Sequence, residues 1–153
     1  MIFDDDDALE IADVVAIRMA DGRLVVHLYH CKFSLEEKAG ARVDDLYVVC
    51  GQAQKSVYWR DRIGFAQFVP HLVSREQKRL AKGLSSRFEK GNLRTLDEIG
   101  LRREVLRPEF KVFVVQPGLS KSGASPPVLE LLAATSLYLK ETFNVEFGVI
   151  SSH

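Results

Sequence analysis

The 153-residue chain is predicted to adopt an α/β fold: a mixed central sheet with an opening antiparallel hairpin and flanking helices. Two N-terminal segments rich in Val and Ile are joined by a turn pair, which predicts the hairpin. Longer segments further along have apolar residues at helical spacing and alternate with short β-branched runs, which predicts strands joined by helices. A hydrophobic content of 46% allows a sizeable core, so we expect one domain over residues 1–153.

The hairpin is the most clearly marked element. Residues 11–19 and 23–33 are rich in β-branched residues and are predicted to be its two strands. Asp21-Gly22 between them is a favoured pair for a two-residue type I′ turn. The first three residues look like an entry into the same sheet.

The remaining elements are expected in the order helix, helix, strand, helix, strand, after a loop that contains Gly40. The predicted helices are 43–59, 74–90 and 127–143, and the predicted strands are 110–116 and 145–150. Ser74 is the expected N-cap of the second helix. Pro117 is expected to end the predicted strand at 110–116. Residues 93–108 have room for a short helix. The first helix has an apolar stripe formed by Val43, Leu46, Tyr47, Cys50, Val57 and Tyr58.

Charge and composition exclude several classes of protein. The 21 basic and 21 acidic residues balance, which argues against a purely electrostatic nucleic-acid binder. No apolar run reaches the roughly 18 residues that span a bilayer. The acidic N-terminus is not a signal peptide, and two cysteines suggest no disulfide framework. We therefore expect a cytoplasmic protein without a membrane partner.

Three ionisable side chains are predicted to meet at the open end of the hairpin's apolar face. The two-residue turn places Asp13 opposite His30, with Lys32 on the same side. A structural Asp–His–Lys network at the sheet rim is one interpretation, because a charge there needs a partner. The other is a divalent-metal site, in which Asp13 binds the metal, His30 adds a ligand or hydrogen bond, and Lys32 orients the attacking water.

This arrangement resembles the PD-(D/E)XK nucleases, which have the restriction-endonuclease-like fold. Asp13 matches the family's first Asp, and His30-Cys31-Lys32 occupies its acidic-x-Lys triplet. His30 replaces the usual acid, which weakens Mg²⁺ binding and favours Mn²⁺ or another transition metal. The segment from Gln54 to Tyr58 resembles the Q-x-x-x-Y element of the RecB-like branch, so the resemblance covers residues 10–60.

The family's upstream helix, which often carries another acid, is not visible in this sequence. Glu10 or the acidic run at residues 4–7 would replace that acid. On the hairpin register Glu10 points to the opposite face, and we therefore rank it below Asp13.

The resemblance implies a nuclease domain that cuts phosphodiester bonds in DNA with Mg²⁺ or Mn²⁺. The implied catalytic residues are Lys32, Asp13, Gln54 and Tyr58, and the implied metal ligands are Asp13, His30 and Glu10. The C-terminal segment is similar to the C-terminal regions of large bacterial helicase-like proteins. That similarity implies a helicase-like domain in the same chain or complex, with this chain as the C-terminal piece of a longer protein.

Basic and aromatic residues predict a nucleic-acid surface. The predicted set is Lys55, Trp59, Arg60, Arg75, Lys78, Arg79, Lys82 and Lys121. The alternatives are a packed helix end for Trp59 and Arg60, a plain surface loop for Lys121, and an ordinary solvated face for Arg75, Lys78, Arg79 and Lys82. The alternative function is a catalytically degraded nucleic-acid-binding or protein-interaction module of the same fold, able to form a homodimer through an exposed sheet edge.

Overall fold

The computed structural model describes residues 1–33, 43–102 and 105–152, so the predicted loop around Gly40 lies outside the described residues. The strands are β1 (Ile2–Asp4), β2 (Val14–Ala20), β3 (Arg23–Cys31), β4 (Phe88–Lys90), β5 (Arg107–Ser120) and β6 (Glu146–Ser152). The helices are α1 (Val43–Lys55), the 3-10 helix η1 (Ser56–Arg60), α2 (Arg62–Ala81), α3 (Leu93–Arg102) and α4 (Pro126–Phe143).

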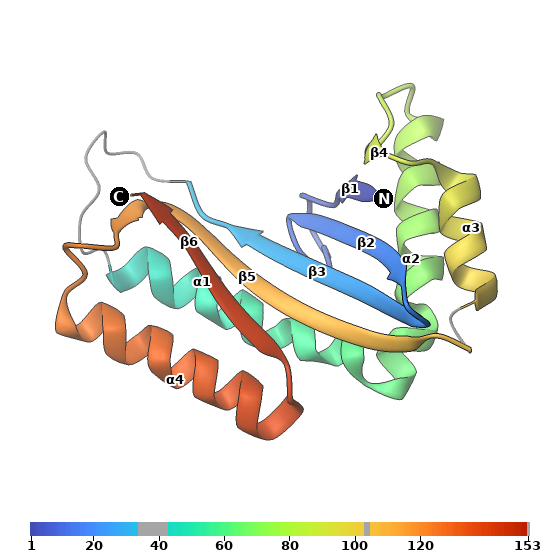
Figure 1. The fold of residues 1–153 in the computed structure, drawn as a ribbon. Helices are drawn as coiled ribbons and strands as arrows, with labels where there is room; N and C mark the ends of the chain where they lie inside the picture. The colour runs from blue at the N-terminus through green and yellow to red at the C-terminus, as the bar shows by residue number, and fades with distance from the viewer. Residues whose placement is uncertain (34–42, 103–104, 153) are drawn as a thin grey trace. The chain divides into compact units, whose positions relative to one another are not determined.

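The six strands form one sheet in the order β4-β1-β2-β3-β5-β6 (Figure 1). β1 pairs antiparallel with β2 and with β4, whereas β5 and β6 are parallel, so the sheet is mixed as predicted. Contacts group the chain into two compact units. The first unit contains Met1–Leu28 and Tyr58–Phe110, and the second contains Tyr29–Val57 and Lys111–His153.

The β2–β3 turn in the first unit has the predicted chemistry. Asp21 and Gly22 both have positive φ angles, 50° and 71°, which a type I′ turn requires. The apolar face predicted for the β2–β3 hairpin is buried except at Met19, which is 38% exposed. The hairpin does not open the sheet, however, because β1 precedes it and pairs with β2.

Helix α2 differs most from the sequence prediction. The sequence places a helix at 74–90 with Ser74 as N-cap, whereas α2 begins at Arg62 and ends at Ala81. Asp61 is its N-cap, and the Asp61 carboxylate accepts a hydrogen bond from the Ile63 N–H at 2.8 Å. Pro70 lies inside the helix, where a break is the usual expectation. Helix α3 lies beside α2 (Figure 1).

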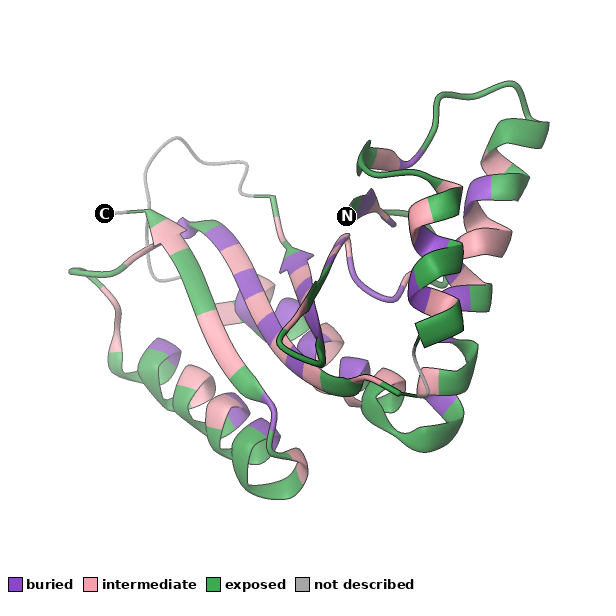
Figure 2. Ribbon diagram, turned by 45° about the vertical axis from the view of Figure 1, so that its right-hand side comes forward, coloured by how far each residue is buried: buried purple, intermediate pink, exposed green. Residues whose placement is uncertain are grey.

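In the second unit, α4 connects the parallel strands β5 and β6, and α1 lies beside α4 (Figure 1). Buried residues alternate with less buried ones along β5 (Figure 2), as expected for a strand with one covered face. β5 continues past Pro117 to Ser120, so the predicted stop is wrong. The pairing with β6 shifts register between Gln116 and Ser120, where Pro117 has no N–H to donate.

Helix α1 is shorter than predicted and has a different buried stripe. It ends at Lys55, and the chain continues as η1. Tyr47 and Tyr58, both expected on the buried stripe, are 60% and 46% exposed. The buried residues are Leu46, Val49, Cys50 and Ala53. Among the described helices, none has the length and apolar character needed to cross a membrane.

Candidate metal centre

Arg75 of α2 holds the loop between β1 and β2 in the first unit. Its guanidinium forms an ion pair with the Asp5 carboxylate and donates hydrogen bonds to the carbonyls of Asp5 (2.6 Å) and Ala8 (2.8 Å). Asp5 is fully buried, and its other carboxylate oxygen accepts a 2.7 Å hydrogen bond from the Ile11 N–H. Burial raises the pKa of Asp5 to about 6, against the opposing effects of the Ile11 N–H and Arg75.

A second arginine, Arg87, lies in the segment between α2 and β4 and supports the same loop. The buried Glu76 accepts hydrogen bonds from the Arg87 N–H (2.9 Å) and the Ser86 hydroxyl (2.7 Å). The Arg87 side chain then donates to the carbonyls of Asp4 (3.0 Å) and Asp6 (3.2 Å). Residues far apart in the sequence therefore fix the course of this acidic loop, whose carboxylates would otherwise repel one another.

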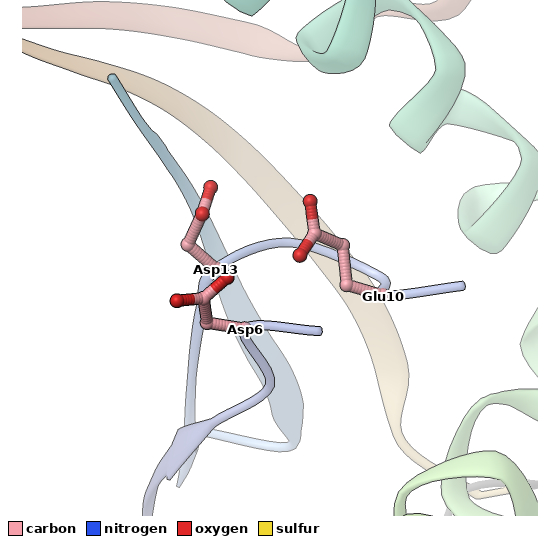
Figure 3. Close-up of side chains that lie close together, drawn as sticks. All are labelled: Asp6, Glu10 and Asp13. Carbon is pink, nitrogen blue, oxygen red and sulfur yellow. The ribbon is translucent and has the colours of Figure 1, made fainter. Parts of the chain in front are cut away.

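Three carboxylates gather where this loop runs into β2. Asp6, Glu10 and Asp13 each place one oxygen within 4.8 Å of the others, and Figure 3 shows their side chains together. Asp6 is exposed, while Glu10 and Asp13 are partly buried. We call these three residues the carboxylate cluster. Among the described residues, no other group of three His, Cys, Asp or Glu side chains meets so closely.

The electrostatics of the carboxylate cluster favour a cation. Burial raises the pKa of Glu10, and the negative charges of Asp13 and Asp6 raise it further, whereas the backbone of Asp7 lowers it. The Asp7 N–H donates to the Glu10 carboxylate at 3.2 Å. Ionised Glu10 is therefore disfavoured mainly by burial and further by the charges of Asp13 and Asp6, and a divalent ion would offset both effects.

The geometry of the cluster fits one hard divalent ion. Mg²⁺ and Ca²⁺ bind oxygen at about 2.1 Å and about 2.4 Å, so two oxygens on opposite sides of one ion lie about 4.2 to 4.8 Å apart. The cluster oxygens fall within that span. Three carboxylates and no imidazole form an oxygen donor set, which suits Mg²⁺ or Mn²⁺.

Two of the three metal ligands predicted from the sequence, Asp13 and Glu10, are brought together. Glu10 lies in the loop before β2, which begins at Val14, so no strand register turns it to the opposite face and its predicted rank below Asp13 is wrong. Asp6 comes from the acidic run that the sequence marked as a substitute for the missing acid.

His30, in the second unit, has a structural partner. Its Nε2 lies 2.5 Å from the Ser56 hydroxyl, and the residue is 2% exposed. Burial lowers the pKa of His30 to about 4, so the imidazole is neutral near pH 7. Lys32 is partly exposed, and its N–H donates to the Val115 carbonyl at 3.0 Å. Asp13 belongs to the first unit, and so its predicted convergence with His30 and Lys32 stays a prediction.

Gln54 and Tyr58 do not share one helix. Gln54 lies in the last turn of α1, and its amide donates to the Thr135 hydroxyl of α4 at 3.4 Å. Tyr58 lies in η1 and packs edge-on against Trp59, with ring centroids 5.2 Å apart. Thr135 therefore provides a polar partner for Gln54 within the second unit, and the one-turn spacing of Q-x-x-x-Y is interrupted at Ser56.

The predicted nucleic-acid residues fall into two groups. The first group, Trp59, Arg75 and Arg79, contacts other parts of the protein. Trp59 packs against Phe68 and His71, and Arg75 binds the loop between β1 and β2. The Arg79 Nε donates to the Ser85 carbonyl at 2.8 Å. The second group is exposed and consists of Lys55, Arg60, Lys78, Lys82 and Lys121. Their role in binding nucleic acid stays a prediction.

Comparison of the chain with protein-family models, with curated proteins and with solved structures found no match. The function is therefore inferred from this chain's own side chains and from the sequence pattern around Asp13.

Proposed function

We propose that the chain is a divalent-metal-dependent nuclease that cleaves phosphodiester bonds in DNA, with a restriction-endonuclease-like fold. One observation carries the proposal: the carboxylate cluster forms around Asp13, the residue that the sequence pattern independently marks as the metal-binding acid. The β2–β3 hairpin and the later β5-α4-β6 unit are compatible with that fold.

In this proposal Asp13, Glu10 and Asp6 hold the ion. When bound, such an ion polarises a phosphoryl oxygen and lowers the pKa of a coordinated water. The partly buried Glu10 and Asp13 limit the number of waters around it, and the hydrogen bond from the Asp7 N–H orients the Glu10 carboxylate. Lys32 offsets the charge of the reacting phosphate, by analogy with the lysine of the acidic-x-Lys triplet.

Metal binding is the first test. Titration of the purified protein with Mn²⁺, followed by calorimetry, should give saturable binding that Asp13→Asn weakens at least tenfold, because one charged oxygen ligand is lost. Asp97→Asn in α3 is the matched control, since it removes an exposed carboxylate elsewhere in the first unit and should leave affinity unchanged. Equal loss in both variants would show that general surface charge, and not the cluster, attracts the ion.

Cleavage is the second test, on single- and double-stranded DNA with Mg²⁺ or Mn²⁺. Lys32→Ala should lower the rate roughly a hundredfold to a thousandfold, as when a transition-state charge partner is lost, while circular dichroism stays native. Lys140→Ala, an exposed lysine of α4, should cleave like wild type. A wild-type protein that neither binds a divalent ion nor cleaves DNA would favour the binding-module alternative.

A further inference from the structure

The first unit contains a basic pocket, separate in its residues from the carboxylate cluster. The C-terminal half of α2 and loop residues 7–9 enclose about 260 Å³. The charged side chains that line it are Arg75, Lys78, Arg79, Lys82, Arg87 and Asp7. This volume is slightly below the roughly 300 Å³ at which drug-sized ligand pockets begin, so it fits a single anionic group better than a whole cofactor.

Several of these cations are not neutralised by the protein. Arg75 is paired with Asp5, and Arg87 with Asp7 at 3.3 Å. Arg79 donates to a neutral carbonyl. Lys78 and Lys82 are exposed, stand one helical turn apart on the same side of α2, and have no acid at ion-pair distance in the described part of the chain. The pocket therefore has an excess of positive charge over its single carboxylate.

Two buried nitrogen atoms of lining residues have neither a hydrogen bond nor an ion pair among the described residues, whereas a third, Arg75 Nε, pairs with Asp5. One is Arg87 Nε, which is a permanent donor, and the other is His71 Nε2. The His71 ring already hydrogen-bonds the Leu9 backbone, and burial lowers its pKa. Buried polar atoms in native proteins are almost always hydrogen-bonded. A phosphoryl group offers several acceptor oxygens, which match the ammonium and guanidinium donors that line the pocket.

We infer that this pocket, the phosphate pocket, binds the terminal phosphate of a nucleic-acid strand. The choice of nucleic acid as the carrier rests on the proposed function, whereas the phosphate site itself rests on the lining described above. The same loop serves both sites: Asp7 lines the phosphate pocket, and its N–H donates to Glu10 of the carboxylate cluster.

The inference is tested by binding without metal, in excess EDTA. A short single-stranded oligonucleotide with a phosphate at one end should bind about tenfold more tightly than the same strand with hydroxyl ends, and inorganic phosphate should compete. The double variant Lys78→Gln/Lys82→Gln should abolish this preference, because hydrogen bonds to charged groups contribute about that factor each. Asp7→Asn removes the carboxylate of the lining and should tighten binding several-fold.

The matched control is Arg18→Gln/Lys140→Gln, which removes two exposed cations outside the pocket and should keep the preference. Equal binding of the phosphorylated and unphosphorylated strands, or an unchanged preference in Lys78→Gln/Lys82→Gln, would overturn the inference. Competition by inorganic phosphate without any preference for a phosphorylated strand end would overturn the nucleic-acid assignment. Because no metal is present, failure of these measurements leaves the proposed metal-dependent cleavage untouched, and loss of metal binding leaves the phosphate pocket untouched.

Discussion

His30 occupies a buried position near the end of β3, where it is 2% exposed. Its Nε2 contact with Ser56 provides one hydrogen bond, and among the described residues Nδ1 has none. Protonation would place an uncompensated charge in this environment, which is why burial lowers the pKa. The residue is thus held in its neutral form, the form in which an imidazole can also bind a metal.

This lowered pKa predicts a pH dependence of stability. The pKa falls from 6.5 to about 4 on folding, so the unfolded state binds the proton first, and stability decreases as pH falls through that window. The wild-type protein should lose about 3 kcal/mol of unfolding free energy relative to His30→Gln between pH 7 and pH 4. Urea denaturation of both proteins in EDTA measures the difference. A difference that stays constant with pH would mean that His30 titrates normally in the folded state.

At the scale of elements, two helical glycines have opposite surroundings. A Cβ added to Gly51 in α1 would meet nothing within 4 Å, whereas at Gly64 in α2 it would lie 1.9 Å from the Tyr58 carbonyl oxygen. The close approach of η1 to the first turn of α2 therefore requires glycine at position 64. At position 51 glycine costs helix propensity without a packing reason.

The two alanine substitutions should consequently change stability in opposite directions. Gly51→Ala should stabilise the protein by about 0.5 to 1 kcal/mol through helix propensity. Gly64→Ala should destabilise it by about 2 kcal/mol or more, because the backbone of η1 has to move. Thermal denaturation followed by circular dichroism compares both variants with wild type. Equal destabilisation by both changes would contradict the described junction of η1 and α2.

At the scale of the whole molecule, the reactivity of the two cysteine thiols reports on how exposed their side chains are in the native state. Neither forms a disulfide in the described part of the chain: Cys31 is exposed, and Cys50, on α1, is 1% exposed. Burial raises the pKa of Cys50, with an opposing effect from its hydrogen bond to Thr135. Low accessibility and a low fraction of thiolate both suppress reaction at Cys50.

Thiol labelling should therefore proceed in two separate steps. The native protein should react rapidly with one equivalent of a disulfide reagent, and the second equivalent should react only as denaturant unfolds the chain. Cys31→Ser should remove the fast step and keep the slow one. Rapid labelling of two thiols in the native protein would contradict the burial of Cys50 and the packing of α1 described above.

The elements that the sequence predicted well are those specified by neighbouring residues. The type I′ turn at Asp21-Gly22 requires two positive φ angles, and Asp-Gly is a pair that adopts them readily. The helix predicted at 127–143 from apolar spacing is α4, which begins at Pro126 and has the left-handed Asn144 as its C-cap. The acid at Asp13 was also identified locally, from its predicted place opposite His30 in the hairpin, although β2 begins one residue after it.

Only the tertiary structure decided the course of α2 and the geometry of the carboxylate cluster. Pro70 predicts a helix end, but burial of Phe68, Val69 and Leu72 on the same helix offsets the lost hydrogen bond, so α2 continues. The acidic loop carries little local information about its shape, because its carbonyls and carboxylates are held by Arg75 and Arg87, more than sixty positions away in the sequence. Turn and periodicity signals act over a few residues, whereas ion pairs and core packing join distant ones. For that reason the sequence singled out Asp13, and the fold determined which acids lie beside it.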